Sequence, residues 1–134
     1  MIITRDEKTQ EIIQTPETLY ECFDVINDDI NLEEWLKMSE KEAIASAHHG
    51  VGKWIRNEWG LWSEGRLKDW FLSMGIKHAD DMSGIILTSY HRVKNNKDVN
   101  LEEQFDHYIE YWLSDEQILQ RRRNKKLTVI NHVL

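Results

Sequence analysis

The sequence is poor in cysteine, proline and glycine, and it has no long apolar run. Its 134 residues include one cysteine, one proline and six glycines. A single cysteine, Cys22, excludes an internal disulfide and is typical of a reducing cytoplasm. The turns of barrels and sandwiches consume glycine and proline, so their scarcity argues against a many-stranded fold.

The chain also lacks the features of a membrane or secreted protein. No apolar run approaches the roughly 20 residues that a membrane-spanning helix needs. The N-terminus, Met1-Ile2-Ile3-Thr4-Arg5, has no signal-peptide core. We therefore expect a cytoplasmic protein, in the bacterial host cytoplasm if the gene belongs to a phage, with no membrane partner.

Positive charge is scarce as well. Lys and Arg total 17 against 24 Asp and Glu, which gives a net charge of −7. This balance excludes a simple basic nucleic-acid coat protein, and we expect no nucleic-acid partner. The charge is uneven, with a net −8 over residues 1–47, +3 over 48–97 and −2 over 98–134.

The middle of the chain has helical periodicity. Apolar residues recur at spacings of three and four from residue 15 to residue 113, and Ser39 with Glu42 forms a capping box. Gly50 and Gly52 interrupt the third of these patterns and indicate a kink or a close approach. The pattern predicts a mainly α fold, a compact bundle of five to six helices.

The two ends have a different character. Residues 1–14 form a β-type extension in which Ile2-Ile3-Thr4 and Glu11-Ile12-Ile13 suggest a hairpin. Residues 114–134 contain a helix end, recapped at Ser114 or Asp115, and then a β-rich tail over 127–134. We expect the N- and C-terminal segments to form a small sheet and, through an exposed edge, a homodimer.

The basic middle holds most of the tryptophan and histidine. Four of the six Trp and four of the six His lie within 48–97. Arg or Lys beside an exposed Trp suits the stacking of a base and the neutralisation of a phosphate. Trp54, Trp70 and Trp112 fit core stripes, whereas Trp59 and Trp62 flank Gly60 in a connector and are the better candidates for a surface role.

Motifs of catalysis and metal binding are missing. There is no His-Glu-x-x-His, paired Cys-x-x-Cys, Walker A loop, dinucleotide fingerprint or nucleophile elbow. The adjacent His48 and His49 point about 100 degrees apart on a helix and do not easily share a metal. We interpret Asp80 as a helix cap and the 121–126 basic run as a solvated helix end. The sequence predicts no metal, no cofactor and no catalytic residue, and it leans away from an enzyme.

Two segments resemble the signatures of a known family. They are His49-Gly50-Val51-Gly52-Lys53-Trp54-Ile55-Arg56-Asn57-Glu58-Trp59-Gly60-Leu61-Trp62 and His78-Ala79-Asp80-Asp81-Met82-Ser83-Gly84-Ile85-Ile86-Leu87-Thr88-Ser89-Tyr90-His91-Arg92. Both are similar to a family of small uncharacterised domains from bacteria and their phages. The resemblance extends over roughly residues 15–113, and Ala79 stands where the family usually carries proline. It implies a domain boundary and two marked surfaces, and no activity.

Polar residues of these two segments form the predicted ligand site. A pocket in which they meet would combine cations, hydrogen-bonding groups and aromatic plates, which suits an anionic planar ligand such as a nucleotide. The set is Arg56, Asn57, Trp59, Trp62, Arg66, Asp81, Thr88, His91 and Arg92. The competing interpretation of Arg56 is a structural ion pair with Asp81.

Three functions remain open. The first is a non-enzymatic binding module of phage or bacterial origin, an inhibitor that captures a nucleotide-like ligand. The second is an immunity or host-takeover module whose acidic first third binds a basic host protein. The third is a small hydrolase that uses His48 or His49 with Asp81 and His91.

Overall fold

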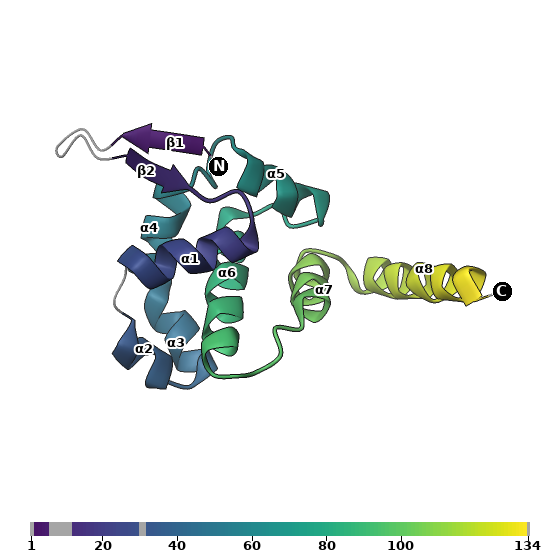
Figure 1. Cartoon of the computed structure of the whole chain (residues 1–134). Helices are drawn as coiled ribbons and strands as arrows, with labels where there is room; N and C mark the ends of the chain where they lie inside the picture. Colours follow the sequence, from purple (N-terminus) through teal and green to yellow (C-terminus); the bar gives the residue numbers. More distant parts are fainter. Residues whose placement is uncertain (1, 6–11, 30–31, 134) are drawn as a thin grey trace.

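Helices make up most of the chain, and one β-hairpin precedes them (Figure 1). The computed structural model describes residues 2–5, 12–29 and 32–133. Within these ranges it contains eight helices, so the mainly α class is confirmed and the predicted count of five to six is too low. The elements are β1 (Ile2–Arg5), β2 (Ile12–Thr15), α1 (Leu19–Asp29), α2 (Glu33–Lys37), α3 (Glu40–Ala47), α4 (Val51–Glu58), α5 (Arg66–Ser73), α6 (Ala79–Lys94), α7 (Leu101–Tyr111) and α8 (Asp115–Val133).

The third predicted helix is two helices, α3 and α4. Its start is as expected, because the Ser39 hydroxyl accepts a hydrogen bond from the Glu42 amide at 3.3 Å. The break falls at residues 48–50, beside the two glycines. A Cβ on Gly52 would lie 2.9 Å from the Ala47 carbonyl oxygen, so this tight junction requires glycine. The two glycines therefore mark both a kink and a close approach.

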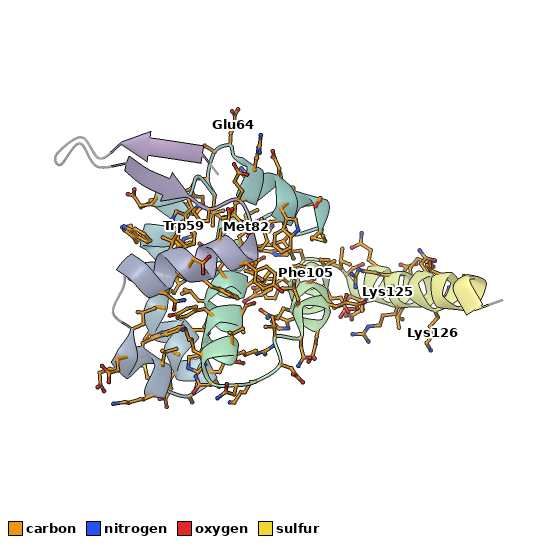
Figure 2. All side chains as sticks on the ribbon, in the orientation of Figure 1. Trp59, Glu64, Met82, Phe105, Lys125 and Lys126 are labelled. Atoms are coloured by element: carbon orange, nitrogen blue, oxygen red, sulfur yellow. The ribbon has the colours of Figure 1, made fainter. Side chains whose placement is uncertain are left out.

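Helix α6 is the centre of the fold. It packs against α1, α3, α4 and α7, which surround it in Figure 1. The side chains of Met82, Ile85, Ile86, Leu87 and Tyr90 are all buried, and Figure 2 shows Met82 among the interior side chains. Burial of one such side chain contributes about 1.5–3 kcal/mol. A helix that is apolar on most sides must be enclosed by other elements, and the four neighbouring helices enclose α6.

The predicted sheet between the two ends of the chain is not seen. β1 pairs antiparallel with β2, with Ile2 opposite Thr15 and Arg5 opposite Ile12. Residues 127–133, predicted as a strand, belong to α8. The Ser114 hydroxyl accepts from the Gln117 amide at 3.2 Å, and the Gln117 side-chain oxygen accepts from the Ser114 amide at 2.9 Å. This cap starts a helix. The loss of helix stability per β-branched residue is too small to end that helix before the tail.

Helix α8 extends away from the rest of the molecule beyond α7 (Figure 1). Residues 127–133 are helical, so they do not supply the C-terminal strand that the expected homodimer requires. Figure 2 shows Lys126 projecting from α8 into open space. In the described part of the chain, no helix, α8 included, is long and apolar enough to cross a membrane.

Candidate functional site

The fold disperses the nine residues that were predicted to form one site. Asp81 and Arg92 lie eleven positions apart on α6, which separates them by about 16 Å along the helix axis. Arg56, Trp59 and His91 are buried. Of the nine, Asp81, Thr88 and Arg92 line hollows on the side of α6 that faces α7.

Arg56 is a buried clamp between helices. Its Nη1 donates to the Ser83 hydroxyl at 2.9 Å and its Nη2 donates to the His48 carbonyl oxygen at 2.8 Å. Its Nε lies 3.2 Å from an Asp80 carboxylate oxygen, in an ion pair without hydrogen-bond alignment. Arg56 thus joins α4 to α6 and to the end of α3. The ion-pair partner is therefore Asp80 and not Asp81 as expected. The N-cap of α6 is His78, so Asp80 is not the cap residue, although it does lie in the first turn of the helix.

The two connector tryptophans have opposite environments. Trp59 is 2 % exposed, lies inside the fold in Figure 2 and packs edge-on against Trp54. Its predicted surface role is therefore wrong. Trp62 is 58 % exposed, and its Nε1 donates to the Asn57 side-chain oxygen at 2.9 Å. Arg66 follows these tryptophans in the sequence and belongs to the same predicted set. Its guanidinium pairs with the Glu17 carboxylate at 3.2 Å.

His91 and Arg92 are adjacent in the chain but hold different parts of the fold. His91 Nε2 donates to the Met38 carbonyl oxygen at 3.1 Å, and its ring packs edge-on against Trp35. Arg92 donates to both Glu40 carboxylate oxygens, at 2.6 and 3.2 Å, and to the Val99 carbonyl oxygen at 2.7 Å. The hydrogen bond from Arg92 lowers the pKa of Glu40, so this carboxylate stays charged. Both predicted ligand-binding side chains are engaged internally.

Three hollows on α6 all have Tyr108 of α7 in their lining, and we call them together the α6–α7 crevice. A Cβ on Gly84 would lie 2.7 Å from the Tyr108 hydroxyl oxygen, so glycine at this position lets the ring lie against α6. Burial, followed by the negative charge of Asp81, raises the pKa of Tyr108. No described residue hydrogen-bonds to its hydroxyl.

The outer cavity of the crevice has a volume of about 330 Å³ and combines aromatic, cationic and acidic groups. The rings of His78 and Trp112 are stacked, with centroids 3.7 Å apart and planes 22° from parallel. Trp112 Nε1 donates to an Asp81 carboxylate oxygen at 2.9 Å. Lys77 and Arg121 add positive charge to the same lining. No described side chain pairs with Lys77, whereas Arg121 pairs with Asp106 at 2.8 Å.

The inner cavity is smaller, about 190 Å³, and it joins both of the segments singled out in the sequence. His48 and Gly52 come from the first segment's neighbourhood, and Asp80, Asp81 and Ser83 from the second. The three residues of the hydrolase interpretation do not all meet, because His91 lies ten positions from Asp81, about 15 Å along α6. Nor do the described residues place three or more His, Cys, Asp or Glu side chains around a metal position.

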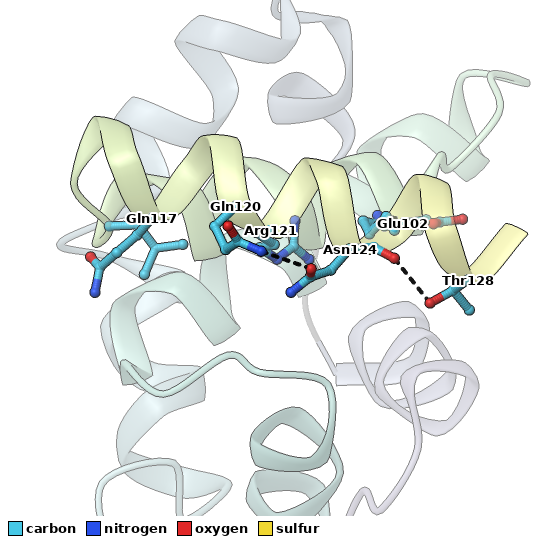
Figure 3. Close-up of a pocket in the computed structure, with 8 residues that line it drawn as sticks. Glu102, Gln117, Gln120, Arg121, Asn124 and Thr128 are labelled. Carbon is cyan, nitrogen blue, oxygen red and sulfur yellow. Dashed lines mark hydrogen bonds and ion pairs between the residues drawn. The ribbon is translucent and has the colours of Figure 1, made fainter.

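A further hollow of about 630 Å³ lies along α8 and is a weaker candidate. Figure 3 shows that its polar groups bind one another along the helix. Gln120 Nε2 donates to the Asn124 side-chain oxygen at 2.9 Å, and the Thr128 hydroxyl donates to the Asn124 carbonyl oxygen at 3.0 Å. Lys125 on its rim is paired with Asp106 at 2.9 Å. Few groups there are left for a ligand.

The comparisons with known proteins identify the domain. Residues 15–94, more than half of the chain, match the family described as "Domain of unknown function (DUF6794)", and the chain belongs to that family. Neither a curated protein nor a solved structure matches the chain. The family match ends at the last residue of α6. The α6 wall of the crevice therefore belongs to the family domain, and the α7 wall is contributed by residues beyond it.

Sequence reasoning missed most of the outer cavity. Trp112 was assigned to a core stripe and Arg121 to a solvated helix end, yet both line it. His78 is the first residue of the second family-like segment and Lys77 directly precedes it, which is a usable signal for both. Nothing local indicated Trp112, because its hydrogen bond to Asp81 joins residues 31 positions apart.

Proposed function

We propose that this chain is a non-enzymatic binding module whose ligand is small, planar and anionic, of the nucleotide type, and that it binds in the outer cavity. The observation that carries the proposal is the stacked His78–Trp112 pair beside Asp81, Lys77 and Arg121 in one cavity. The ligand class is the one predicted from the sequence, but the aromatic and cationic residues proposed to bind it are different from those in the predicted set. Asp81 is common to both sets.

Each part of such a ligand has a counterpart in the cavity. A planar ring extends the His78–Trp112 stack, and base–aromatic stacking is worth about 1–3 kcal/mol per base. The Lys77 ammonium, which no described side chain neutralises, attracts the anionic group. Asp81 accepts from ligand hydroxyls or amines. At about 330 Å³ the cavity lies at the lower end of the range for small-molecule sites.

A pair of matched tryptophans provides the test. Trp112 and Trp62 are 54 % and 58 % exposed, and each donates its Nε1 to a side-chain oxygen at 2.9 Å. Isothermal titration with a panel of nucleoside monophosphates should yield a binder. For that binder, Trp112→Leu should weaken affinity about tenfold and Trp62→Leu less than twofold. Equal losses of affinity in the two variants, or a loss in Trp62→Leu alone, would indicate that the ligand binds at the connector after α4.

If the ligand is held without turnover, the protein acts as an inhibitor that sequesters it, in a bacterial or phage setting. Incubation of the identified nucleotide with the protein, followed by chromatography of the nucleotide, checks this point. We expect the nucleotide to be recovered unchanged. Conversion to a nucleoside or a cyclic product would instead make the chain an enzyme.

The second candidate function is a protein-interaction module, supported by acidic side chains on α1 to α3. Asp24, Glu34 and Glu42 are exposed there, in the part of the sequence with a net charge of −8. Such a surface favours a basic partner. Native mass spectrometry of protein purified from its own host separates the candidates. A mass increase of nucleotide size supports the first, and a complex with another polypeptide supports the second.

A further inference from the structure

We propose that the third cavity of the crevice is a separate binding site for the ammonium group of a small primary amine. This cavity has a volume of about 300 Å³ and lies between the C-terminal half of α6 and the start of α7. Besides Tyr108 it is lined by polar or charged side chains, namely Glu40, Thr88, Arg92, Glu103, Gln104 and His107. It differs from the outer cavity in its charge and in having a side-chain acceptor, on Gln104, that is not used in a hydrogen bond.

The side-chain amide of Gln104 supplies an unused acceptor. Gln104 is 6 % exposed, and its Nε2 donates to the Val99 carbonyl oxygen at 2.9 Å and to the Ser89 hydroxyl at 3.1 Å. A carbonyl oxygen only accepts, so the atom facing Val99 must be the nitrogen, which fixes the orientation of the amide. Gln104 Oε1 is buried and has no hydrogen-bond partner among the described residues. A buried acceptor of this kind costs stability until a donor reaches it.

The net charge of the cavity favours a cation over an anion. Arg92 is already engaged in the fold, because its Nε and Nη2 donate to Glu40 and its Nη1 to the Val99 carbonyl oxygen. Glu103, which is exposed at the cavity, makes no hydrogen bond or ion pair within 4 Å to a described side chain, and its charge interacts with that of Arg92. Two carboxylates and one guanidinium leave a net charge of −1. One ammonium group therefore neutralises the cavity.

A primary ammonium group also satisfies the geometry of donors and acceptors. It carries three N–H donors, of which one can reach Gln104 Oε1 and another the Glu103 carboxylate. Because Gln104 Oε1 is buried, an ammonium group reaches it only when side chains of the lining move, and Glu103 and His107 are the exposed members of that lining. The proposal does not depend on nucleotide binding, and it is tested without nucleotide.

The experiment is an NMR titration that follows the Gln104 side-chain amide signals in the full chain. The probes are n-butylammonium chloride and, at equal ionic strength, tetramethylammonium chloride, which has the charge but no N–H donor. We expect a saturable shift with n-butylammonium and none with tetramethylammonium. Glu103→Gln should weaken n-butylammonium binding at least tenfold. The matched control, Glu102→Gln, alters the neighbouring exposed carboxylate, which pairs with Lys125 on α8 at 3.2 Å, and should change affinity less than twofold.

Three outcomes overturn the proposal. Equal shifts with both cations mean that the cavity responds to charge screening alone. A shift that never saturates means that no site exists. Unchanged affinity in Glu103→Gln, with the Gln104 signals still in their folded positions, means that the amine binds elsewhere and that water satisfies Gln104 Oε1.

Discussion

The two longest helices, α6 and α8, are held in place by opposite kinds of interaction. α6 is enclosed by apolar side chains, whereas α8 exposes Leu119 and Leu127 by 60 % and 53 %. α8 is attached to α7 through ion pairs, among them Arg121 with Asp106 at 2.8 Å and Arg122 with Glu110 at 2.8 Å. The family match covers α1 to α6. The stability of the fold therefore resides in the family domain, while Arg121, the α8 residue in the lining of the outer cavity, depends on a polar attachment.

The largest effect is expected from a cavity in α6. Ile86 is fully buried, so Ile86→Ala should lower the free energy of unfolding by about 2–5 kcal/mol. Leu119→Ala on α8 is the matched control and should cost less than about 0.5 kcal/mol. Urea denaturation of both variants checks the contrast. Similar losses in the two would mean that α8 belongs to the same cooperative core.

Arg56→Ala should have the next largest effect. The substitution removes two hydrogen bonds and one ion pair that join α4, α6 and the end of α3. We expect a loss of about 2–3 kcal/mol, less than for a fully buried ion pair because the Asp80 side chain is 54 % exposed. Arg66→Ala, at an exposed pair with Glu17, should change stability by less than about 0.5 kcal/mol. Comparable melting temperatures for the two variants would refute the clamp.

Gly84→Ala probes the contact between α6, which belongs to the family domain, and α7, which lies beyond the family match. Alanine at this position would place Cβ 2.7 Å from the Tyr108 hydroxyl oxygen but 3.5 Å from Cζ. We expect a loss of about 1–2 kcal/mol in the natural background. In a Tyr108→Phe background the clash disappears, and alanine should stabilise the helix by about 0.5–1 kcal/mol. A double-mutant cycle measures this change of sign, and its absence would show that Tyr108 does not lie against Gly84.

The sequence predicts the local features of this fold well. The N-cap at Ser39, one half of the expected Ser39–Glu42 capping box, and the break at Gly50 and Gly52 depend on neighbouring residues, and both are found in the structure. The C-terminal strand was wrong because a composition rich in β-branched residues was weighed without the capped helix that leads into it. There a nucleated helix overrides the weak preference of single residues.

The site was only partly predictable, for two different reasons. Asp81 and Arg92 cannot share a small pocket when eleven positions separate them on one helix, and the rise of a helix per residue makes this visible in the sequence. The pairing of Asp81 with Trp112 is different, because it depends on how α7 packs across α6. No pattern in the chain indicates that contact. A site built from two helices is determined by packing, which local signals do not describe.

The smallest expected effect concerns the attachment of α8. Burial alone would raise the pKa of Asp106, but hydrogen bonds from Lys125 and Arg121 hold it below its ordinary value of 3.8. The hydrogen bond from Arg122 likewise lowers the pKa of Glu110 below 4.5. A carboxyl with a lowered pKa stabilises the docked helix above its ordinary pKa, and this stabilisation is lost as the pH falls through the lowered value. Docking of α8 should therefore be intact at neutral pH and weaken below about pH 4.

Salt should weaken the same attachment at neutral pH, because raising the ionic strength from 0.1 to 1 M shortens the Debye length from about 10 to about 3 Å. Amide hydrogen exchange along α8 should then speed up by roughly fivefold, the equivalent of about 1 kcal/mol, while exchange in α6 is unchanged. Arg121→Gln should produce part of this effect without salt. Arg123→Gln should not, because Arg123 contacts the neutral Gln120 side chain at 3.3 Å. Exchange in α8 that is indifferent to salt and to Arg121→Gln would mean that ion pairs do not hold this helix to α7.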